Sequence, residues 1–235
     1  MDARIRFYLE RKFELSLRDF PSEGIEIRES TIHRDAPWKR MSIVRIGQSV
    51  LATGIPRVVQ AIRPVIQDMS VWELFHSTGA SELQRALNPS DAATLREGFH
   101  YTIKKEQYLR RQALSEMVVK VLESNSPTHA ARFKAGSQST SSGPYFQPAF
   151  AIFQEDKEVA LSGIHWISPH LVEIGVETNK AHQHKGYGLA LVAAATEWIL
   201  DQGAVVYYRA FPSNIGSVRI ARKLGFELTW QNVYA

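Results

Sequence analysis

A strand, a short polar loop and a helix follow one another in the second half of the chain, and two glycines stand where the helix begins. The strand is expected over residues 171–178 and the helix over 189–201, closed by Gly203. The loop ends in Gln183-His184-Lys185-Gly186-Tyr187-Gly188. A helix N-terminus presents unpaired N–H groups and partial positive charge, and glycine lets an anion approach the backbone closely. The segment therefore predicts an α/β unit with a candidate diphosphate-binding loop.

The glycine spacing of this loop differs from the two commonest nucleotide-binding patterns. Only Gly186 and Gly188 are present, so the loop is neither the dinucleotide G-x-G-x-x-G nor the Walker G-x-x-x-x-G-K-[ST]. Lys185 would add a charge-assisted contact to a phosphate. A G-x-G at a helix start is also an ordinary tight turn, so the loop alone does not decide the ligand.

A second motif follows in Asn214-Ile215-Gly216-Ser217 and runs on to Leu224-Gly225-Phe226. A loop of the form Q-x-x-G-x-G followed by such a segment resembles the GCN5-related N-acetyltransferase (GNAT) superfamily. The resemblance implies an α/β GNAT fold, a mixed central β-sheet flanked by helices, with an additional N-terminal α/β region. It covers the chain from about Ala149 to the end.

The resemblance also implies a site for acetyl-CoA. The strand end Val176-Glu177-Thr178 would pair with the pantetheine arm, main-chain amides from His184 to Leu189 would hold the pyrophosphate, and Asn214 and Ser217 would line the groove. Asn214 is equally suited to cap the last helix, and the two roles are compatible. The cofactor-binding residues so implied are Val176, Thr178, Gln183, His184, Lys185, Gly186, Tyr187, Gly188, Leu189, Asn214 and Ser217.

The family's chemistry is direct attack of a neutral amine on the thioester, which requires a group that removes a proton from the ammonium ion. Glu173 and Glu177 alternate with Gly175 on one face of the strand that leads into the loop. We expect Glu173 first, and Glu177 second, as catalytic carboxylates. A solvated edge-strand carboxylate is the alternative for each of them.

One position departs from the family pattern. Many members carry a tyrosine seven residues after the Asn as general acid, and this chain has Ala221 there. Water or another tyrosine would take that role, with Tyr187, Tyr207, Tyr208 and Tyr234 as candidates. The alternative is that the thiolate leaves without an acid, since a free thiol has a pKa of about 8.5. The leading function is thus N-acetyl transfer from acetyl-CoA to a primary amine of a small molecule or an aminoacyl group. The alternative is a non-catalytic acyl-CoA-binding sensor or interaction module.

Composition excludes several classes of function. The chain has 235 residues and no cysteine, which rules out disulfides, thiolate metal sites and a cysteine nucleophile. Its net charge of +4 comes from interspersed charges, so no nucleic-acid partner is expected. His182 and His184 lack carboxylates at ligand spacing, so no metal is expected, and Trp166, Trp198 and Trp230 are expected in the core or a cleft wall.

The first half of the chain predicts a packed α/β region that helps to build the acceptor site. We expect domains over 1–125 and 146–235, the latter the acetyl-CoA-binding core, with a Ser/Gly-rich linker or loop over 126–145. Strands are expected between residues 25 and 52, and a β-hairpin over 149–167. A short apolar segment is expected over 71–75 and a further strand over 205–211. Helices are expected over 57–67, 81–87, 89–97, 108–123 and 214–224.

No apolar signal segment is readable near the N-terminus, and no run approaches the length of a membrane span. We therefore expect a cytoplasmic protein with a small-molecule amine acceptor and no membrane partner. The oligomeric state is left open, with a homodimer as the candidate assembly.

Overall fold

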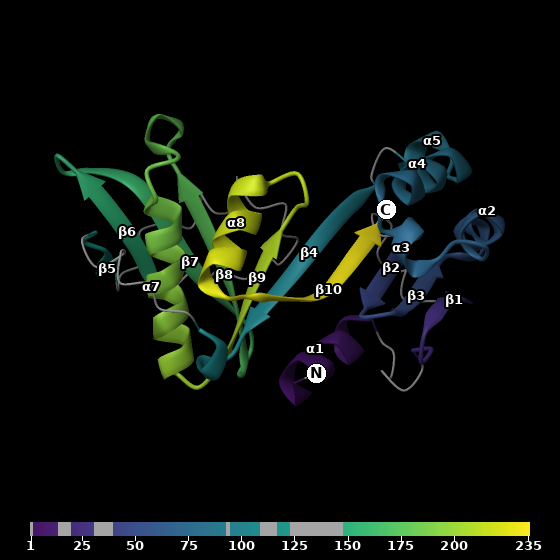
Figure 1. The fold of residues 1–235 in the computed structure, drawn as a ribbon, viewed down its shortest axis with the longest axis horizontal. Helices are drawn as coiled ribbons and strands as arrows, with labels where there is room; N and C mark the ends of the chain where they lie inside the picture. The colour runs from purple at the N-terminus through teal and green to yellow at the C-terminus, as the bar shows by residue number, and fades with distance from the viewer. Residues whose placement is uncertain (1, 14–19, 31–39, 93–94, 109–116, 123–147) are drawn as a thin grey trace. The chain divides into compact units, whose positions relative to one another are not determined.

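The computed structural model of the chain describes residues 2–13, 20–30, 40–92, 95–108, 117–122 and 148–235. They form two compact units of mixed α and β structure, coloured from purple to yellow along the chain in Figure 1. The first unit comprises Met1–His100 and Leu228–Ala235, and the second comprises Tyr101–Glu227. The linker expected over 126–145 lies outside the described residues, and the division at 125 and 146 stays a prediction.

The first unit is built on a sheet with the strand order β1-β3-β2-β10-β4. β2 and β3 form an antiparallel hairpin, β1 pairs with β3 in parallel, and β10 pairs antiparallel with β2. The strands predicted between residues 25 and 52 are thereby confirmed. Their bounds are β1 Gly24–Glu29, β2 Met41–Ile46, β3 Ser49–Gly54, β4 Arg96–Ile103 and β10 Glu227–Tyr234.

Five described helices belong to this unit: α1 Ala3–Phe13, α2 Pro56–Ile66, α3 Val71–Leu74, α4 Ser77–Ala86 and α5 Pro89–Ala92. α2 confirms the predicted helix and starts with Pro56, where the missing N–H costs nothing. Pro64 lies in its last turn, and the helix ends two residues later. The apolar stripe of α2 packs with β2 and β3 in one core that includes Met41, Ile43, Val50, Ala52, Val58, Ile62 and Ile66.

The helix predicted over 81–87 with Ser81 as its cap is corrected by the structure. α4 begins at Ser77, and the Ser81 hydroxyl donates a hydrogen bond to the Ser77 carbonyl inside the helix. Gly79 permits this earlier start, because a Cβ atom there would lie 2.3 Å from the Leu74 carbonyl oxygen. The segment at 71–75 forms the short helix α3, capped by a reciprocal pair of hydrogen bonds between Ser70 and Glu73.

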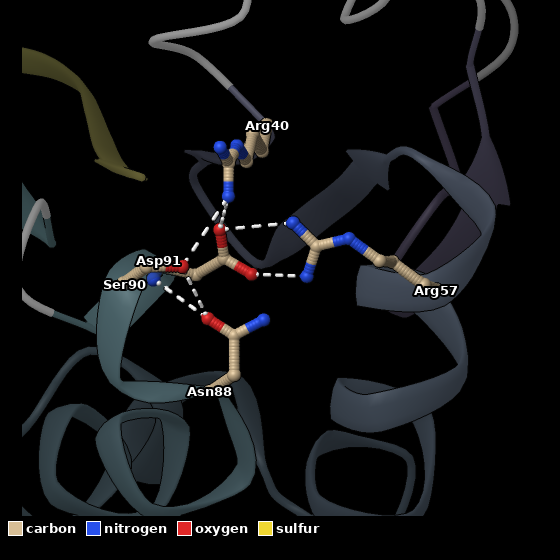
Figure 2. A network of polar contacts seen from close by, with 5 residues as sticks. All are labelled: Arg40, Arg57, Asn88, Ser90 and Asp91. Atoms are coloured by element: carbon tan, nitrogen blue, oxygen red, sulfur yellow. Dashed lines mark hydrogen bonds and ion pairs between the residues drawn. The ribbon is translucent and has the colours of Figure 1, made fainter.

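α5 ends at Ala92, so the helix expected over 89–97 is too long, and residues 96–103 form β4 instead. Asp91 of α5 is 1% exposed, and its carboxylate joins Arg40 and Arg57 (Figure 2). Asn88 accepts a hydrogen bond from the Asp91 N–H at 3.0 Å. The short helix is thus anchored by side chains from outside it.

The second unit carries a sheet with the strand order β9-β8-β7-β6-β5. Neighbouring strands are antiparallel except β8 and β9, which are parallel. α7 lies along the face of β6, β7 and β8 (Figure 1). The elements are β5 Lys120–Leu122, β6 Ala149–Gln154, β7 Lys157–Ser168, β8 Leu171–Thr178, α7 Tyr187–Asp201, β9 Val205–Ala210 and α8 Ile215–Leu224. Two 3₁₀ turns cover Lys105–Gln107 and Lys180–His182.

The predicted hairpin, the strands at 171–178 and 205–211, and the helices at 189–201 and 214–224 are confirmed, with α7 starting two residues earlier. The amphipathic helix predicted over 108–123 is wrong where it can be compared, because Lys120–Leu122 pair with β6 as β5. Residues 109–116 of that prediction lie outside the described ranges. β10 was not predicted, since its buried residues 230–233 are consecutive and do not alternate.

Within the described ranges, no helix combines the length and hydropathy that a membrane crossing requires.

Candidate acetyl-CoA site

The strands β8 and β9 pair only at their beginnings. Leu171, Val172 and Glu173 face Val205, Val206 and Tyr207, and the register ends there. β8 continues to Thr178 and β9 to Ala210. Because the other side of β8 is paired with β7 along this stretch, the unpaired side leaves backbone groups that an extended ligand can use. Val176 and Thr178, expected to contact the pantetheine arm, lie on this part of β8.

The loop after β8 turns into α7 through two residues with left-handed backbone. His184 has a φ of 64° and Gly186 a φ of 88°, and Gly186 occupies the N-cap position. No side chain of the described residues caps the helix, so its first N–H groups are left for another acceptor. Tyr187 is buried, and its hydroxyl accepts a hydrogen bond from Gln154 Nε2 at 2.5 Å. This arrangement suits an anion at the helix start.

Gly188 lies where the loop packs closely against neighbouring elements. A Cβ atom at this position would lie 3.2 Å from Ile220 Cδ1, 3.6 Å from Thr178 Oγ1 and 4.0 Å from Val176 Cγ2. The end of β8, the start of α7 and the side of α8 therefore meet at Gly188. Gln183 adds a hydrogen bond from its Nε2 to the Thr178 carbonyl at 3.4 Å, which ties the loop back to the strand.

Asn214 is the N-cap of α8. Its Oδ1 accepts a hydrogen bond from the Ser217 N–H at 3.1 Å, which confirms the capping role expected for it. Both residues keep solvent contact, Asn214 as an exposed residue and Ser217 as a half-buried one. Gly225 closes the same helix with a φ of 84°.

Tyr208 lies next to the point where β8 and β9 stop pairing, and its ring packs with Phe226 at a centroid distance of 5.9 Å. Burial raises the pKa of its hydroxyl to about 12, an effect that the neighbouring Ser217 opposes. The oxygen is buried, and no described residue makes a well-formed hydrogen bond to it. Ala221, at the position where many GNAT proteins have tyrosine, is fully buried. A phenol is therefore present near the end of the β8–β9 pairing, although it comes from β9 and not from α8.

Glu173 and Glu177 project from the face of β8 opposite to Val172 and Val176. Glu173 is 17% exposed and lies near two bases, 3.9 Å from His165 Nδ1 and 3.8 Å from Arg209 Nε. Glu177 is exposed. The structure therefore places Glu173, and not Glu177, in a charged cluster next to the end of the β8–β9 pairing.

Sequence reasoning missed several residues that the fold brings to this region. His165 and Arg209 join Glu173 from neighbouring strands, Gln154 reaches Tyr187, and Met117 Cε lies 3.2 Å from the Cβ position of Gly186. Only the pairing of β7, β8 and β9 could have indicated His165 and Arg209.

The described residues contain no group of three or more His, Asp or Glu side chains placed to hold a metal ion.

Of the tryptophans expected in the core or a cleft wall, Trp230 lies in the core, where it is 1% exposed and stacks on His100. Trp198 of α7 is half-buried, and Trp166 packs edge-on against it at 6.5 Å but is 39% exposed, so a core position for Trp166 is wrong.

The family profile of the acetyltransferase (GNAT) domain matches residues 83–227, more than half of the chain. The protein belongs to the GNAT acetyltransferase family. The expected fold class, a GNAT fold preceded by an N-terminal α/β region, is thereby confirmed, as is the assignment to acetyltransferases. Among curated proteins, none matches the sequence of the chain.

Several solved GNAT structures are similar to this chain. A GCN5-related N-acetyltransferase from Kribbella flavida is 24% identical, with 63% of each chain covered and a TM-score of 0.48. A putative GNAT acetyltransferase from Novosphingobium aromaticivorans is 17% identical, with 60% of this chain and 63% of that chain covered and a TM-score of 0.46. A GCN5-related N-acetyltransferase-like protein from Streptococcus suis is 16% identical, with coverages of 83% and 84% and a TM-score of 0.45. The chain spans less than two thirds of the length of the Kribbella flavida and Novosphingobium aromaticivorans proteins.

Membership of the GNAT family implies the use of acetyl-CoA. The residues present fit that ligand, since an uncapped helix start, a close approach at Gly188 and an unpaired stretch of β8 occur in one unit. Glycine at position 188 lets the start of α7 pack closely against Ile220, Thr178 and Val176, so that the helix start lies beside the end of β8.

Proposed function

We propose that the protein transfers the acetyl group of acetyl-CoA to a primary amine of a small molecule or an aminoacyl group by direct attack. The observation that carries this proposal is the unpaired end of β8 beside the uncapped, glycine-lined start of α7. Acetyl-CoA supplies an activated acetyl thioester when bound. The chain has no cysteine, so an acyl-cysteine intermediate is excluded and direct transfer is the simplest route.

The cofactor would be held mainly by the backbone. Val176 and Thr178 would offer main-chain groups of β8 to the pantetheine arm, and the amides from His184 to Leu189 would bind the pyrophosphate. Lys185 adds positive charge from an exposed position, and Gln183 stabilises the loop. Asn214 and Ser217 line the groove from the start of α8, while Asn214 also caps that helix.

The acceptor has to be deprotonated before it attacks, because alkylamines are charged near neutral pH. We assign this step to Glu173, whose carboxylate lies at the end of the β8–β9 pairing. Glu177, four residues further along the same face, is the second carboxylate of the proposed site. The leaving thiolate would take its proton from Tyr208, which stands in for the tyrosine that Ala221 replaces.

The test measures binding and turnover separately. Acetyl-CoA and CoA are expected to raise the thermal unfolding midpoint of the full chain, as any ligand of the native state does. Turnover is measured as thiol release from acetyl-CoA with a polyamine, an arylalkylamine, an aminoglycoside and an amino-acid amide, with the acetylated product checked by mass spectrometry. Because the protein has no thiol of its own, every thiol detected comes from CoA.

Lys185→Gln is expected to weaken CoA binding, and Lys157→Gln, at the exposed start of β7, is the matched control. If CoA does not stabilise the protein and none of the four amines is acetylated, the proposal is rejected. A second candidate, a non-catalytic acyl-CoA-binding module, is favoured by Ala221. Stabilisation by acetyl-CoA without turnover of any of the four amines would select it.

A further inference from the structure

Three charged or titratable side chains converge on one face of the second unit's sheet. In the β7–β8 register His165 lies directly opposite Glu173, and in the β8–β9 register Glu173 lies opposite Tyr207. Residues opposite one another share a face of the sheet, and Arg209, two residues beyond Tyr207, shares it too. The three adjacent strands therefore bring His165, Glu173 and Arg209 together on the face opposite to Val172 and Val176.

The Glu173 carboxylate uses each oxygen for a different base. Oε2 lies 3.9 Å from His165 Nδ1, and Oε1 lies 3.8 Å from Arg209 Nε. The side chains of His165, Glu173 and Arg209 are 15%, 17% and 23% exposed. The three side chains are thus largely, but not completely, removed from water.

Glu173 as the sole base would not keep the proton that it removes from the ammonium ion. A carboxylate holds a proton weakly near neutral pH, and an adjacent guanidinium favours its charged form. A proton taken from an ammonium ion would therefore need a second acceptor close by. Imidazole is the side chain that gains and loses a proton near neutral pH, and His165 is the imidazole that faces Glu173.

We propose that His165 is a relay residue that takes over from Glu173 the proton removed from the acceptor amine, with Arg209 holding the carboxylate in place. The inference rests on the proposed function. In the first step an N–H bond of the ammonium breaks and an O–H bond forms on Glu173 Oε2. In the second step that O–H bond breaks and an N–H bond forms on His165 Nδ1, which restores the carboxylate beside an imidazolium.

The observed distance is compatible with this role. At 3.9 Å the pair is an ion-pair contact and not a hydrogen bond, so transfer needs either one bridging water or a contraction of about 1 Å. Catalytic hydrogen bonds are commonly long before the substrate binds. Among the described residues, the charged groups in contact with Glu173 are His165 from β7 and Arg209 from β9.

The first experiment tests the coupling without any acceptor. The titration of His165 in the full chain is followed by NMR with histidine labelled in the ring, and His165→Gln assigns its signal. Loss of a neighbouring negative charge disfavours imidazolium, so Glu173→Gln should move the titration midpoint to lower pH. Arg209→Met removes a positive charge and should move it upward. Glu155→Gln, in the exposed turn after β6, is the control and should leave it in place.

The second experiment measures turnover with the amine that has the highest kcat/KM among the four tested. His165→Gln should lower kcat at least about tenfold with the KM for acetyl-CoA unchanged. It should also remove the rise in kcat/KM between about pH 6 and pH 7, where imidazole loses its proton. Added imidazole should restore activity to His165→Ala, which a purely structural role for His165 would not allow. His170→Gln, an exposed histidine between β7 and β8, should behave as the unchanged protein.

The two experiments separate the relay from the proposed function. If Glu173→Gln and Arg209→Met leave the His165 titration unmoved, the relay is wrong whatever the enzyme acetylates. If an amine is acetylated and His165→Gln retains the full rate and the same pH profile, the relay is wrong and the proposed function stands. If acetyl-CoA binds and none of the amines is acetylated, the proposed function fails and the relay fails with it.

Discussion

Arg57 at the start of α2 and Asp91 in α5 form a two-point ion pair across 34 residues of sequence. Arg57 donates to Asp91 through both terminal nitrogens, at 2.5 Å and 3.2 Å (Figure 2). Arg40 adds a third hydrogen bond at 2.5 Å. Burial alone would raise the pKa of Asp91, but the hydrogen bonds and charges of the two arginines hold that pKa below its usual value. The carboxylate is therefore ionised, buried and paired.

Asp91→Asn is expected to lower the free energy of unfolding by about 2 kcal/mol at pH 7, between the values typical of exposed and buried pairs. The arginine side chains are 36% and 48% exposed, so water can solvate them again once the carboxylate charge is gone. Urea unfolding measures the change. Glu82→Gln removes an exposed pair with Arg85 on α4 and serves as the control, with an expected change below about 0.5 kcal/mol.

The same pair predicts how stability depends on pH. The pKa of Asp91 is lower in the folded protein than in the unfolded chain, where it is near 3.9. The stability that the ionised Asp91 contributes is therefore complete above about pH 5, and it is lost as the pH falls through the unfolded pKa and then the lowered folded pKa. The difference in stability between the unchanged protein and Asp91→Asn should shrink between pH 5 and pH 2. A difference that stayed constant over this range would contradict the assignment.

Gly98 of β4 is expected to tolerate no side chain. An added Cβ would lie 2.6 Å from Asn232 Oδ1 and 2.8 Å from His100 Nε2, two atoms joined by a buried hydrogen bond. His100 cannot easily move, because its ring stacks on Trp230 at 4.7 Å. Gly98→Ala should cost about 2 kcal/mol in urea unfolding. Gly216→Ala, whose Cβ would have ordinary contact at 3.6 Å within α8, should be neutral or slightly stabilising.

The parts of the fold that were predicted correctly depend on local signals. Asn214 and Gly225 mark the two ends of α8 because one caps the N-terminus and the other adopts a left-handed conformation at the C-terminus. The hairpin of β6 and β7 follows from two largely apolar runs on either side of a short turn at Glu155 and Asp156. Each of these features is decided within a few residues of sequence.

The parts that were missed depend on contacts between distant residues. The spacing of Val118 and Val121 imitates a helix, yet Val121 lies in β5, which exists because β6 is available for pairing. Likewise, the contact of Glu173 with Arg209 depends on the parallel register of β8 and β9 across the intervening helix. Alternation placed Glu173 on a strand face but could not show which side chains share that face.

Gly186 provides a test of the cofactor loop. Its φ of 88° disfavours any other residue, and a Cβ would lie 3.2 Å from Met117 Cε. Gly186→Ala should weaken CoA binding about tenfold, measured by calorimetry, because the loop would have to change shape. Gly203→Ala is the matched control. Gly203 has a φ of 73° at the other end of α7, and nothing lies within 4 Å of its Cβ position. Gly203→Ala should lower the free energy of unfolding by a similar amount while the affinity for CoA stays unchanged. Equal losses of CoA affinity in both variants would contradict a specific role for Gly186.

Tyr208→Phe should separate stability from catalysis. The hydroxyl is buried beside Ser217 without a well-formed hydrogen bond to a described residue, so its removal should change the free energy of unfolding by less than about 0.5 kcal/mol. If this phenol donates a proton to the leaving thiolate, kcat should fall about tenfold while CoA affinity stays the same. Because burial raises the pKa of Tyr208 to about 12, its loss should lower kcat equally at all pH values from 6 to 10. Tyr234→Phe in β10 tests the second candidate in parallel, and unchanged kcat in both variants would exclude both phenols as the acid that protonates the thiolate.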